Sequence, residues 1–555
     1  MSLVGKTWKI KNTDKNKPLM ARLLENRGLT DETEIQHFFY PDEKRDFHDP
    51  FLMKDMKRAV ERIGLAIEKS ERVMVFGDYD VDGITGSAIL MRTLAKLGAN
   101  VSYRLPHRIE DGYGLREKFI REFAKLDVKL IITTDNGISC FNEVELANKN
   151  GMDVIITDHH TIPEKLPNAY AILHPKLPDS GYPFADLTGA GVALKLAQAL
   201  FTTRLKTDPK IEIKKLLDLA CMGTIGDLGA LRGENRYIVK EGLKVLDETR
   251  WPGLSRLKEY AGIRGKIDTH EIGFLLGPRI NAAGRISHPS HALKLLLCDV
   301  EHTHVLAETL EQLNHKRQRM MEEIMGRAEF LAAKQASESI IIIADKEFHG
   351  GIIGLIASKI VDKYSRPAIV MEKRGDILVG SCRSVASVNI VEAIGSAKEF
   401  LTHFGGHAAA AGFDLPKGNL KPFTERVREH IGKTVKNGVH KPILSVDCEL
   451  PHSDVSMRTV NMIKTFAPFG MENEVPRFVC NNIEVHEYGT VGSGDRHLKL
   501  KAKLNGTLID CIGFNLGKFA EKFKGLKKFD AVCKIEENEW RGNKKVQLKL
   551  VDLKI

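Results

Sequence analysis

The sequence predicts an α/β protein with two α/β domains, joined by a long helix and followed by a small C-terminal β-barrel. Three observations predict this organisation. Apolar runs of strand length alternate with amphipathic segments from residue 72 onward, a second set of this kind begins at Ser339, and short alternating strands follow Pro442. With 555 residues and 43% hydrophobic content, the chain is long enough for several domains with large cores.

Charge and composition exclude some classes of protein. The formal net charge of +10 is compatible with a polyanionic partner, but a diffuse surplus is also ordinary for a large solvated surface. No uncharged run reaches the roughly 18 residues that a membrane span needs, and the N-terminus has no signal-peptide core. Eight cysteines without a CxxC pair indicate neither a disulfide framework nor a zinc site. We therefore expect a cytoplasmic protein without a membrane partner.

The first α/β domain is predicted at residues 71–295, after a mainly helical N-terminal segment at 1–70. Its strands are expected near 72–76, 101–105, 129–133, 153–157 and 169–173, and its helices near 85–97, 115–126 and 141–150. This alternation predicts a mostly parallel sheet with helices on both faces. Ligands of such sheets bind beyond the carboxyl ends of the strands, so polar residues there are the ones to inspect.

The stretch RVMVFGDYDVDGITGSAIL places three carboxylates directly after the first strand. Asp78, Asp80 and Asp82 alternate, and alternate residues of an extended segment share a side. Gly83 is expected to let the backbone turn, and Thr85 to cap the helix that follows. A lone motif of this kind is more often a surface turn.

Other strand ends carry residues of the same kind. Asp135 follows one strand, Asp158, His159 and His160 follow the next, and Asp227 lies further on in ACMGTIGDLGAL. Each taken singly is commonly a helix cap or a structural histidine, but their joint occurrence indicates a site. Clustered carboxylates repel one another unless a cation is present, and hard oxygen ligands suit magnesium or manganese. One histidine would ligate while its neighbour, facing the other side, would contact a phosphate or a water. This pattern indicates phosphoester hydrolysis by two metal ions.

Four motifs, GDYDVDG, TTDNG, TDHH and GTIGDL, occur in the order of the DHH phosphoesterase superfamily, which the chain resembles. Within it, PHRIEDGYG, GPRINAAGRI, SCRS and GGHAAAAG resemble the bacterial RecJ family of single-stranded-DNA-specific 5′-to-3′ exonucleases, over roughly residues 45–555. The resemblance implies that two Mn²⁺ or Mg²⁺ ions are bound by Asp80, Asp82, Asp135, His159 and Asp227. Asp78, Asp158 and His160 would complete the catalytic group. Several relatives carry a histidine where Phe76 stands, so that ligand is missing here.

The second half of the chain continues the predicted α/β organisation. A connecting helix is predicted at 296–335, and a second α/β unit follows at 336–440. The resemblance implies that this unit is a DHH-associated domain. By resemblance, a pocket for a terminal phosphate and the adjoining DNA backbone would be formed by Arg108, Arg279, Asn281, Arg285, Ser381, Arg383 and His407. The AAAAG run can also serve close helix packing.

Residues 441–555 are predicted to form an all-β module. Stretches such as HLKLKAKL and KKVQLKLVDLKI, divided by Gly and Asn turns, fit an OB-fold, and the resemblance supports it. From His486 onward there are 15 Lys and Arg against 9 Asp and Glu, interspersed with aromatic residues, namely Tyr488, Phe514, Phe523, Phe529 and Trp540. Some of these rings must be core. A basic face with a few exposed rings would hold a single strand of DNA.

The resemblance also implies partners and a role. Single-stranded DNA would be the substrate, a single-strand-binding protein and a helicase would be partners, and the setting would be DNA repair and recombination. Two alternatives stay open. One is a DHH phosphoesterase acting on short oligoribonucleotides, cyclic dinucleotides or polyphosphate, against which the added barrel argues. The other is a non-catalytic DHH relative serving as a replication scaffold, whose acidic motifs would be expected to have decayed.

Overall fold

The chain forms two compact units. The computed structural model describes residues 2–434, 442–540 and 542–555; one unit comprises residues 1–42 and 440–555, and the other residues 43–439. The expected helical segment 1–70 is thus divided between the two units. The expected boundary between residues 440 and 441 lies outside the described residues.

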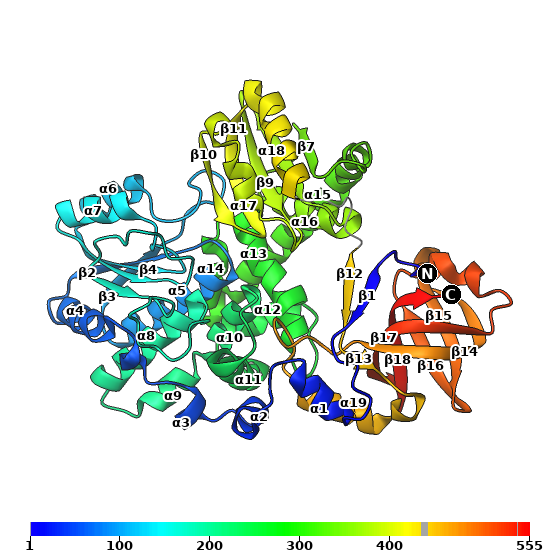
Figure 1. The fold of residues 1–555 in the computed structure, drawn as a ribbon. Helices are drawn as coiled ribbons and strands as arrows, with labels where there is room; N and C mark the ends of the chain where they lie inside the picture. Colours follow the sequence, from blue (N-terminus) through cyan, green and yellow to red (C-terminus); the bar gives the residue numbers. More distant parts are fainter. Residues whose placement is uncertain (1, 435–441, 541) are drawn as a thin grey trace. The chain divides into compact units, whose positions relative to one another are not determined.

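The larger unit begins with a parallel sheet of five strands (Figure 1). The strand order is β3-β2-β4-β5-β6, formed by β2 (Arg72–Gly77), β3 (Asn100–Arg104), β4 (Val128–Thr134), β5 (Asp153–Thr157) and β6 (Ala171–Leu173). This confirms the predicted parallel α/β architecture. All carboxyl ends lie at one edge, because every strand runs in the same direction.

Helices cover both faces of this sheet (Figure 1). One face packs against α4 (Met56–Glu68), α5 (Val81–Lys96) and α8 (Gly189–Arg204), and the other against α6 (Glu117–Lys125) and α7 (Phe141–Lys149). Alternation within β2 explains the two layers, since Val73 and Val75 enter the first core while Met74 and Phe76 enter the second. Phe76 is fully buried against Phe119, so this position faces away from the α5 side.

A helical region follows and ends in one long helix. Its elements are α9 (Pro209–Lys214), α10 (Leu217–Gly226), α11 (Gly233–Asp247), α12 (Pro252–Tyr260), the π-helix η2 (Glu271–Leu276), α13 (Gly277–Ile286), α14 (Ser290–Leu297) and α15 (Thr303–Ala333). The 31-residue α15 confirms the predicted long connecting helix. It contacts α13 at one part of its length and the second α/β domain at another.

The second α/β domain contains a mixed sheet of strand order β10-β11-β9-β8-β7. Its elements are β7 (Ile341–Asp345), α16 (Ile353–Tyr364), β8 (Ala368–Arg374), β9 (Ile377–Arg383), α17 (Ile390–Gly395), β10 (His403–His407), β11 (Ala410–Pro416) and α18 (Leu420–Thr434). Only β7 and β8 pair in parallel. The AAAAG run forms a turn and the start of β11, along which β10 returns tightly. Its Ala411 is also buried in the core shared with α17 and α18, so the run serves close helix packing as well.

The smaller unit contains the predicted barrel. Its five barrel strands are β14 (Phe478–Val491), β15 (His497–Leu504), β16 (Thr507–Gly513), β17 (Lys528–Trp540) and β18 (Asn543–Lys554), and pairing of β14 with β17 closes the ring. Inward-facing Leu498 and Leu500 alternate with outward-facing lysines along β15, as the sequence pattern predicted. The OB-fold prediction is therefore confirmed.

Residues 1–42 contribute to the barrel unit. β1 (Thr7–Ile10) pairs in parallel with β12 (Ile443–Val446), and α1 (Leu19–Glu25) and α2 (Glu32–Phe39) pack against α19 (Met457–Thr465) and the barrel core. Trp8 donates a hydrogen bond of 2.7 Å to the Asp552 carboxylate. The N-terminal helices thus stabilise the module that carries the chain's C-terminal strands.

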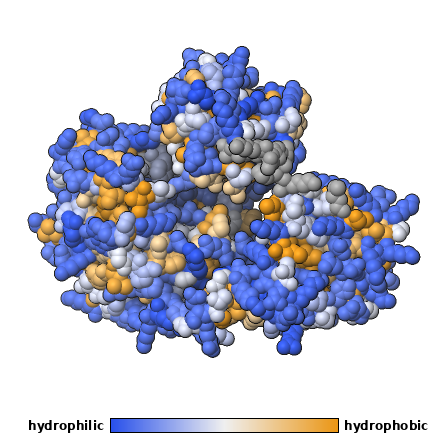
Figure 2. All heavy atoms as spheres, in the orientation of Figure 1, coloured by the Kyte–Doolittle hydropathy of each residue, from blue (hydrophilic) through white to orange (hydrophobic). Residues whose placement is uncertain are grey.

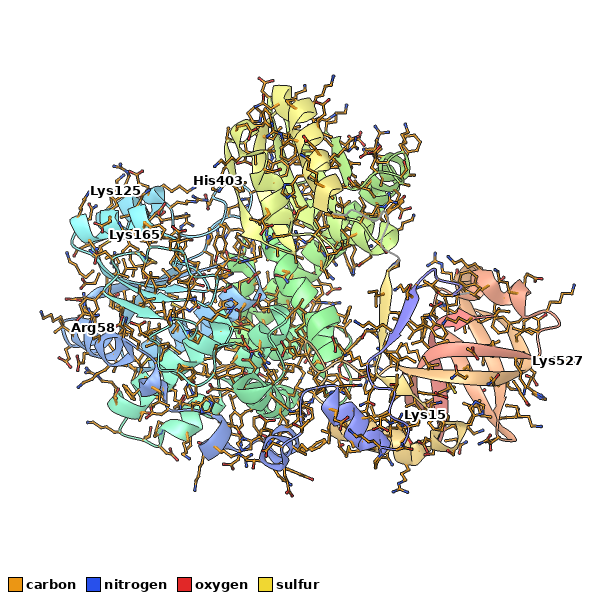
Figure 3. All side chains as sticks on the ribbon, in the orientation of Figure 1. Lys15, Arg58, Lys125, Lys165, His403 and Lys527 are labelled. Carbon is orange, nitrogen blue, oxygen red and sulfur yellow. The ribbon has the colours of Figure 1, made fainter. Side chains whose placement is uncertain are left out.

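One face of the molecule, drawn in Figure 2, is mostly hydrophilic, with small separated apolar areas. Figure 3 shows Lys125 and Lys165 at the outside of the first α/β domain and Lys527 at the outside of the barrel. Within the described residues, every helix is too short or too polar to cross a membrane.

Candidate metal centre and phosphate-binding residues

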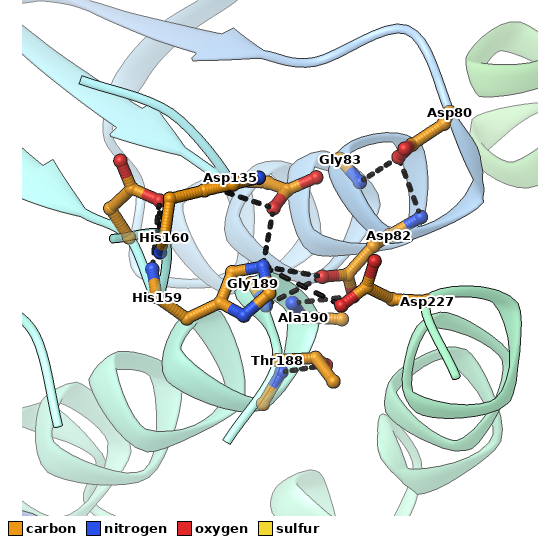
Figure 4. A network of polar contacts seen from close by, with 12 residues as sticks. Asp80, Asp82, Gly83, Asp135, His159, His160, Thr188, Gly189, Ala190 and Asp227 are labelled. Carbon is orange, nitrogen blue, oxygen red and sulfur yellow. Dashed lines mark hydrogen bonds and ion pairs between the residues drawn. The ribbon is translucent and has the colours of Figure 1, made fainter. Parts of the chain in front are cut away.

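The acidic loop after β2 is the N-terminus of α5 (Figure 4). Asp80 caps the helix, since its Oδ1 accepts from the backbone N–H groups of Asp82 (3.1 Å) and Gly83 (3.2 Å). The expected cap at Thr85 is wrong: its hydroxyl donates to the Val81 carbonyl inside the helix. Asp82 therefore lies in the first helical turn, and the three aspartates do not share one extended segment.

Gly83 has a different role from the one predicted. It lies within α5 without a positive φ, and a Cβ there would approach the Asp78 Cβ within 2.6 Å. The glycine is needed for close approach, not for a turn. Helix and acidic loop can therefore pack directly on each other.

Asp135 follows β4 in a left-handed conformation with φ of 63°, which is costly for a residue other than glycine. Its backbone N–H donates to the Thr157 carbonyl at 3.0 Å, which fixes it between β4 and β5. Gly189 lies so close that a Cβ would come within 2.6 Å of the Asp135 Cβ. The fold thus forces the Asp135 carboxylate into one position.

Asp82 is held by the N-terminus of α8. Its two carboxylate oxygens accept from the backbone N–H groups of Gly189 at 2.6 Å and Ala190 at 2.9 Å (Figure 4). A helix N-terminus favours a negative charge there. The sequence analysis missed these two residues, although the small residues of LTGAGVA mark the approach.

His159 lies at the centre of the acidic group (Figure 4). Its Nε2 is 3.0 Å from Asp135 Oδ1, 3.7 Å from Asp82 Oδ2 and 3.6 Å from Asp227 Oδ2. Asp227 lies at the end of α10 and not at a strand end, and its side chain is 35% exposed. Residues from β4, β5, α5 and α10 thereby converge on one point.

Asp158 organises the histidines instead of facing the acidic group. Its Oδ1 accepts from the backbone N–H groups of His159 and His160 and lies 2.8 Å from His160 Nδ1, while Oδ2 accepts from the Ile138 N–H. The two imidazoles lie side by side, with centroids 4.6 Å apart, and not on opposite sides as expected. The reason is that β5 ends at Thr157, before them.

The protonation states of the two histidines differ. Burial alone would lower the pKa of His160, but the hydrogen bond and charge of Asp158 outweigh it and raise this pKa to about 9. Burial also opposes ionisation of Asp158, yet the His160 partner lowers its pKa. Burial, followed by the charge of His160, lowers the pKa of His159 to about 3. His159 is therefore neutral, the form in which histidine binds a metal.

The donor atoms fit divalent cations. Three sets of donors each lie within 4.8 Å of one another, namely Asp82, His159 and Asp227; Asp78, Asp80 and Asp135; and Asp135, His159 and His160. Asp135 and His159 each belong to two of these sets, and they lie 3.0 Å apart. Asp78 Oδ1 is buried without a hydrogen-bond partner, which is expected of a group whose partner is a cation. The carboxylate-rich sets, one of them with a single imidazole, suit Mn²⁺ and Mg²⁺.

Burial and mutual repulsion raise the pKa values of these carboxyl groups. Burial, then the charge of Asp80, raises the pKa of Asp82 to about 6. Desolvation, then the charges of Asp82 and Asp80, raises the pKa of Asp227 to about 8. The pKa values of Asp78 and Asp135 shift upward for the same two reasons. Without metal, the group therefore holds protons at neutral pH.

We expect metal binding to release protons at pH 7. A cation needs the ionised carboxylates, so it displaces the proton from Asp227, and the share of the release that comes from Asp227 should disappear as pH rises above about 8. The measurement is calorimetric titration of Mg²⁺ in buffers of different ionisation enthalpy. Asp227→Asn should release fewer protons than the unchanged protein. Identical heats in all buffers at pH 7 would contradict the expectation.

A cluster of arginines lies beside the acidic loop. Arg108 lies over the Tyr79 ring at 3.9 Å, and its Nε is buried without a hydrogen-bond partner. Burial, followed by the charges of Arg108 and Arg383, lowers the pKa of Arg285 to about 9. The Arg285 guanidinium donates to the Gly351 carbonyl at 3.1 Å, which connects the two α/β domains. Guanidinium groups held this close favour an anion between them.

Ser381 and Arg383 extend this cluster from the second domain. They lie two residues apart on β9, and the Arg383 guanidinium donates to the Ser381 hydroxyl at 3.3 Å. A Cβ at Gly354 would come within 2.9 Å of Arg383 Nη2, so both residues lie at the first turn of α16. The sequence analysis missed this helix N-terminus, in the stretch HGGIIG, whose dipole favours a negative charge beside these two side chains.

His407 also reaches the first domain. Its Nδ1 lies 3.2 Å from the Thr161 hydroxyl, and its ring stacks on His160 with centroids 6.2 Å apart. The second domain therefore contacts the loop that carries His159 and His160. The sequence analysis did not single out Tyr113. Its hydroxyl oxygen lies 3.2 Å from His160 Nδ1.

Arg279 and Asn281, both on α13, are engaged by protein groups. Arg279 donates to both carboxylate oxygens of Glu311, at 2.5 and 3.1 Å. Asn281 Oδ1 accepts from the backbone N–H of Val81 at 3.2 Å, so it fixes the start of α5. Arg317 of α15 is a further guanidinium near Arg279, and its pKa is lowered by burial and by that neighbour.

The barrel carries a separate basic surface. Lys499, Lys501 and Lys503 project outward from β15. Phe514 is 49% exposed, and Lys549 Nζ lies 4.9 Å from its centroid. Phe523 and Phe529 are core residues, Tyr488 is half exposed, and the Trp540 side chain lies outside those described.

Three family models match the chain. The DHH family N-terminal domain matches residues 72–224, the DHHA1 domain matches residues 337–433 and the RecJ OB domain matches residues 446–552. The parallel sheet, the acidic edge and the second α/β domain thus define a DHH-family protein with an added barrel.

The chain belongs to the RecJ family. It is 37% identical to the single-stranded-DNA-specific exonuclease RecJ of Bacillus subtilis, covering 98% of this chain and 70% of that protein. It is 31% identical to RecJ of Escherichia coli, covering 96% of this chain and 95% of the relative. The crystal structure of RecJ from Thermus thermophilus in complex with Mn²⁺ superimposes with a TM-score of 0.82 at 30% identity, covering 99% of this chain and 79% of that one.

Proposed function

We propose that this protein is an exonuclease that hydrolyses single-stranded DNA with two Mn²⁺ or Mg²⁺ ions. The observation that carries the proposal is the convergence of Asp80, Asp82, Asp135, His159 and Asp227 at one edge of the first sheet. Membership of the RecJ family supports it, since the relatives are named as single-stranded-DNA-specific exonucleases. The mechanism is metal-assisted displacement at phosphorus, which needs no side-chain nucleophile.

The protein's own residues supply binding and orientation. Asp135 belongs to the set with Asp78 and Asp80 and lies 3.0 Å from His159 Nε2, so it would link that set to the set of Asp82, His159 and Asp227. Asp82 is oriented by the α8 N-terminus, and neutral His159 completes its set. When bound, the two ions activate a water and neutralise the charge of the phosphate oxygens. His160, positively charged and held by Asp158, is placed to contact a phosphate oxygen of the substrate.

The second domain is proposed to recognise the strand end. Arg108, Arg285 and Arg383, with Ser381 and the first turn of α16, provide more positive charge than an internal phosphodiester requires. We assign them to a 5′-terminal phosphate, which sets the direction from 5′ to 3′. Arg279 and Asn281 support this surface through Glu311 and Val81, and His407 joins it to the catalytic loop.

Further parts of the proposal concern organisation and setting. We assign residues 71–295 to the catalytic domain, 296–335 to the connecting helix, 336–440 to the end-recognition domain and 441–555 to strand binding. A single-strand-binding protein and a helicase are proposed as partners in cytoplasmic DNA repair and recombination, because both generate or hold single strands.

Blunt duplex DNA is expected to be a poor substrate. The two α/β domains contact each other through Thr161 with His407 and through Arg285 with Gly351, so the metal residues are bounded on the side of the second domain. The measurement compares initial rates on end-labelled blunt duplex and on the same duplex with a 5′ tail, with Mn²⁺ and with EDTA. Short oligoribonucleotides and cyclic dinucleotides serve as competing substrates. Comparable rates on blunt and tailed duplex would overturn single-strand specificity.

A further inference from the structure

A cavity lies at the C-terminal end of α5, whereas the candidate metal-binding residues lie at the N-terminal end of this helix. Asp82 is in the first turn of this helix, while Arg92, Ala95 and Lys96 are in its last turns, and 16 residues of helix rise about 24 Å. The cavity has a volume of about 480 Å³, within the range of about 300–1,000 Å³ found for small-molecule sites. None of its lining residues belongs to the metal centre or to the arginine cluster beside it.

The lining combines apolar side chains with cations. The apolar residues come from α5, α8 and α14 and from the positions just before α10 and α12, namely Met91, Ala95, Phe201, Leu297, Leu216 and Trp251. Four cations, Arg92, Lys96, Lys215 and Arg250, face a single carboxylate, Glu212. Glu212 lies 2.5 Å from Lys215 and 3.9 Å from Lys96, so one anion serves two of the four cations. The cavity therefore carries an excess of positive charge.

Arg92 shows that this charge is incompletely satisfied. Its guanidinium lies 3.6 Å from the centroid of the Trp251 ring and donates to the Leu296 carbonyl, yet its Nε is buried without a partner. Burial lowers the pKa of Arg92 to about 10, although the charges of Asp218 and Asp299 oppose this shift. Asp218 also accepts a hydrogen bond from Trp251 Nε1, so it lies behind the ring. An anionic ligand would add counter-charge for the remaining cations of the lining and a partner for the Arg92 Nε.

We propose that this cavity binds a nucleoside 5′-monophosphate. Trp251 with Arg92 and the neighbouring apolar side chains suits a flat heterocycle, and Lys96, Lys215 and Arg250 suit a dianionic phosphate. The source of the ligand rests on the proposed function, because strand hydrolysis from an end releases mononucleotides. The cavity is thus a product-binding site remote from the metals.

Calorimetric titration of the full-length protein in Mg²⁺ with deoxyadenosine 5′-monophosphate tests this proposal. Deoxyadenosine and inorganic phosphate are titrated separately, and each is expected to bind at least about tenfold more weakly than the nucleotide. Equal binding of inorganic phosphate would reduce the cavity to a simple anion site and overturn the proposal.

Variants locate the binding. Arg250→Glu, at an exposed position, should weaken nucleotide binding at least about tenfold, and Glu212→Gln should strengthen it by freeing Lys215. Lys244→Glu, an exposed charge reversal on α11 outside the cavity, is the matched control and should leave the affinity unchanged. Asp135→Asn should also leave it unchanged. Binding that disappears in Asp135→Asn but survives Arg250→Glu would place the nucleotide at the metals and contradict the inference.

Activity assays keep the two proposals separate. Arg250→Glu is expected to digest single-stranded DNA at the unchanged rate when mononucleotide is absent. Loss of nucleotide binding with full nuclease activity supports the cavity as a distinct site. A protein that digests single strands but does not bind the nucleotide refutes the cavity proposal alone.

Discussion

Asp135→Ala is expected to abolish hydrolysis of single-stranded DNA while leaving DNA binding intact. Asp135 belongs to the donor set of Asp78 and Asp80 and lies 3.0 Å from His159 of the other set, so under the proposed assignment its loss would remove a ligand from both ions. Retention of more than about a tenth of the activity at saturating Mn²⁺, a loss of less than ~1.4 kcal/mol in transition-state stabilisation, would contradict the two-metal assignment. The measurement is the single-turnover rate on an end-labelled strand, with binding followed by anisotropy.

The left-handed backbone at Asp135 calls for a matched control. Asp127 has φ of 55° and an exposed side chain far from any donor set, so Asp127→Ala carries a similar backbone cost without removing a ligand. It should retain full activity. Asp135→Asn adds a second comparison, because Asn tolerates this backbone and lacks only the charge.

Thermal stability distinguishes loss of metal from loss of fold. In EDTA, Asp135→Asn should unfold at a temperature no lower than that of the unchanged protein, because burial and neighbouring charges already disfavour ionisation of Asp135. Adding Mg²⁺ should raise the unfolding temperature of the unchanged protein more than that of the variant. An equal rise in both would show that Asp135 is not a ligand.

The order of strands and helices was predictable because the signals are local. The strand near 72–76 and the helix near 141–150 were placed within one or two residues, since buried parallel strands are continuous apolar runs. The start of α5 could not be predicted in this way, because both Asp80 and Thr85 are possible caps. Only the packing of Asp78 against Gly83 decides in favour of Asp80. Tertiary packing therefore determines which residue caps the N-terminus of α5.

The candidate site was predictable as a list of residues but not as an arrangement. Strand ends indicated Asp135 and His159, since parallel strands share one carboxyl edge. The backbone hydrogen bonds from Gly189 and Ala190 to Asp82 join residues more than a hundred positions apart, which no local pattern reveals. Arg279 pairs with Glu311, 32 positions away on another helix, and this pairing separates Arg279 from the other arginines that the same motifs indicated.

The second large effect is expected at the strand end. Arg383→Ala should lower the rate on 5′-phosphorylated single strands by about tenfold or more relative to 5′-hydroxyl strands. A charge-assisted hydrogen bond is worth roughly 1.5–3 kcal/mol, and a terminal phosphate carries more charge than an internal one. The measurement is the ratio of initial rates on two strands that differ by one phosphate, and metal affinity should not change.

Arg279→Ala provides the comparison, because its guanidinium is already bound to Glu311 while Arg383 is bound only to neutral groups, the Ser381 hydroxyl and the Cys382 carbonyl. If Arg279 acts by positioning α13 and α15, its loss should lower the rates on both strands in similar proportion. Arg383 should instead change the ratio. An equal fractional loss on both strands for Arg383→Ala would show that this arginine holds the internal backbone or the fold, and direction would then have to arise from Arg108 and Arg285, which lie nearer the acidic loop.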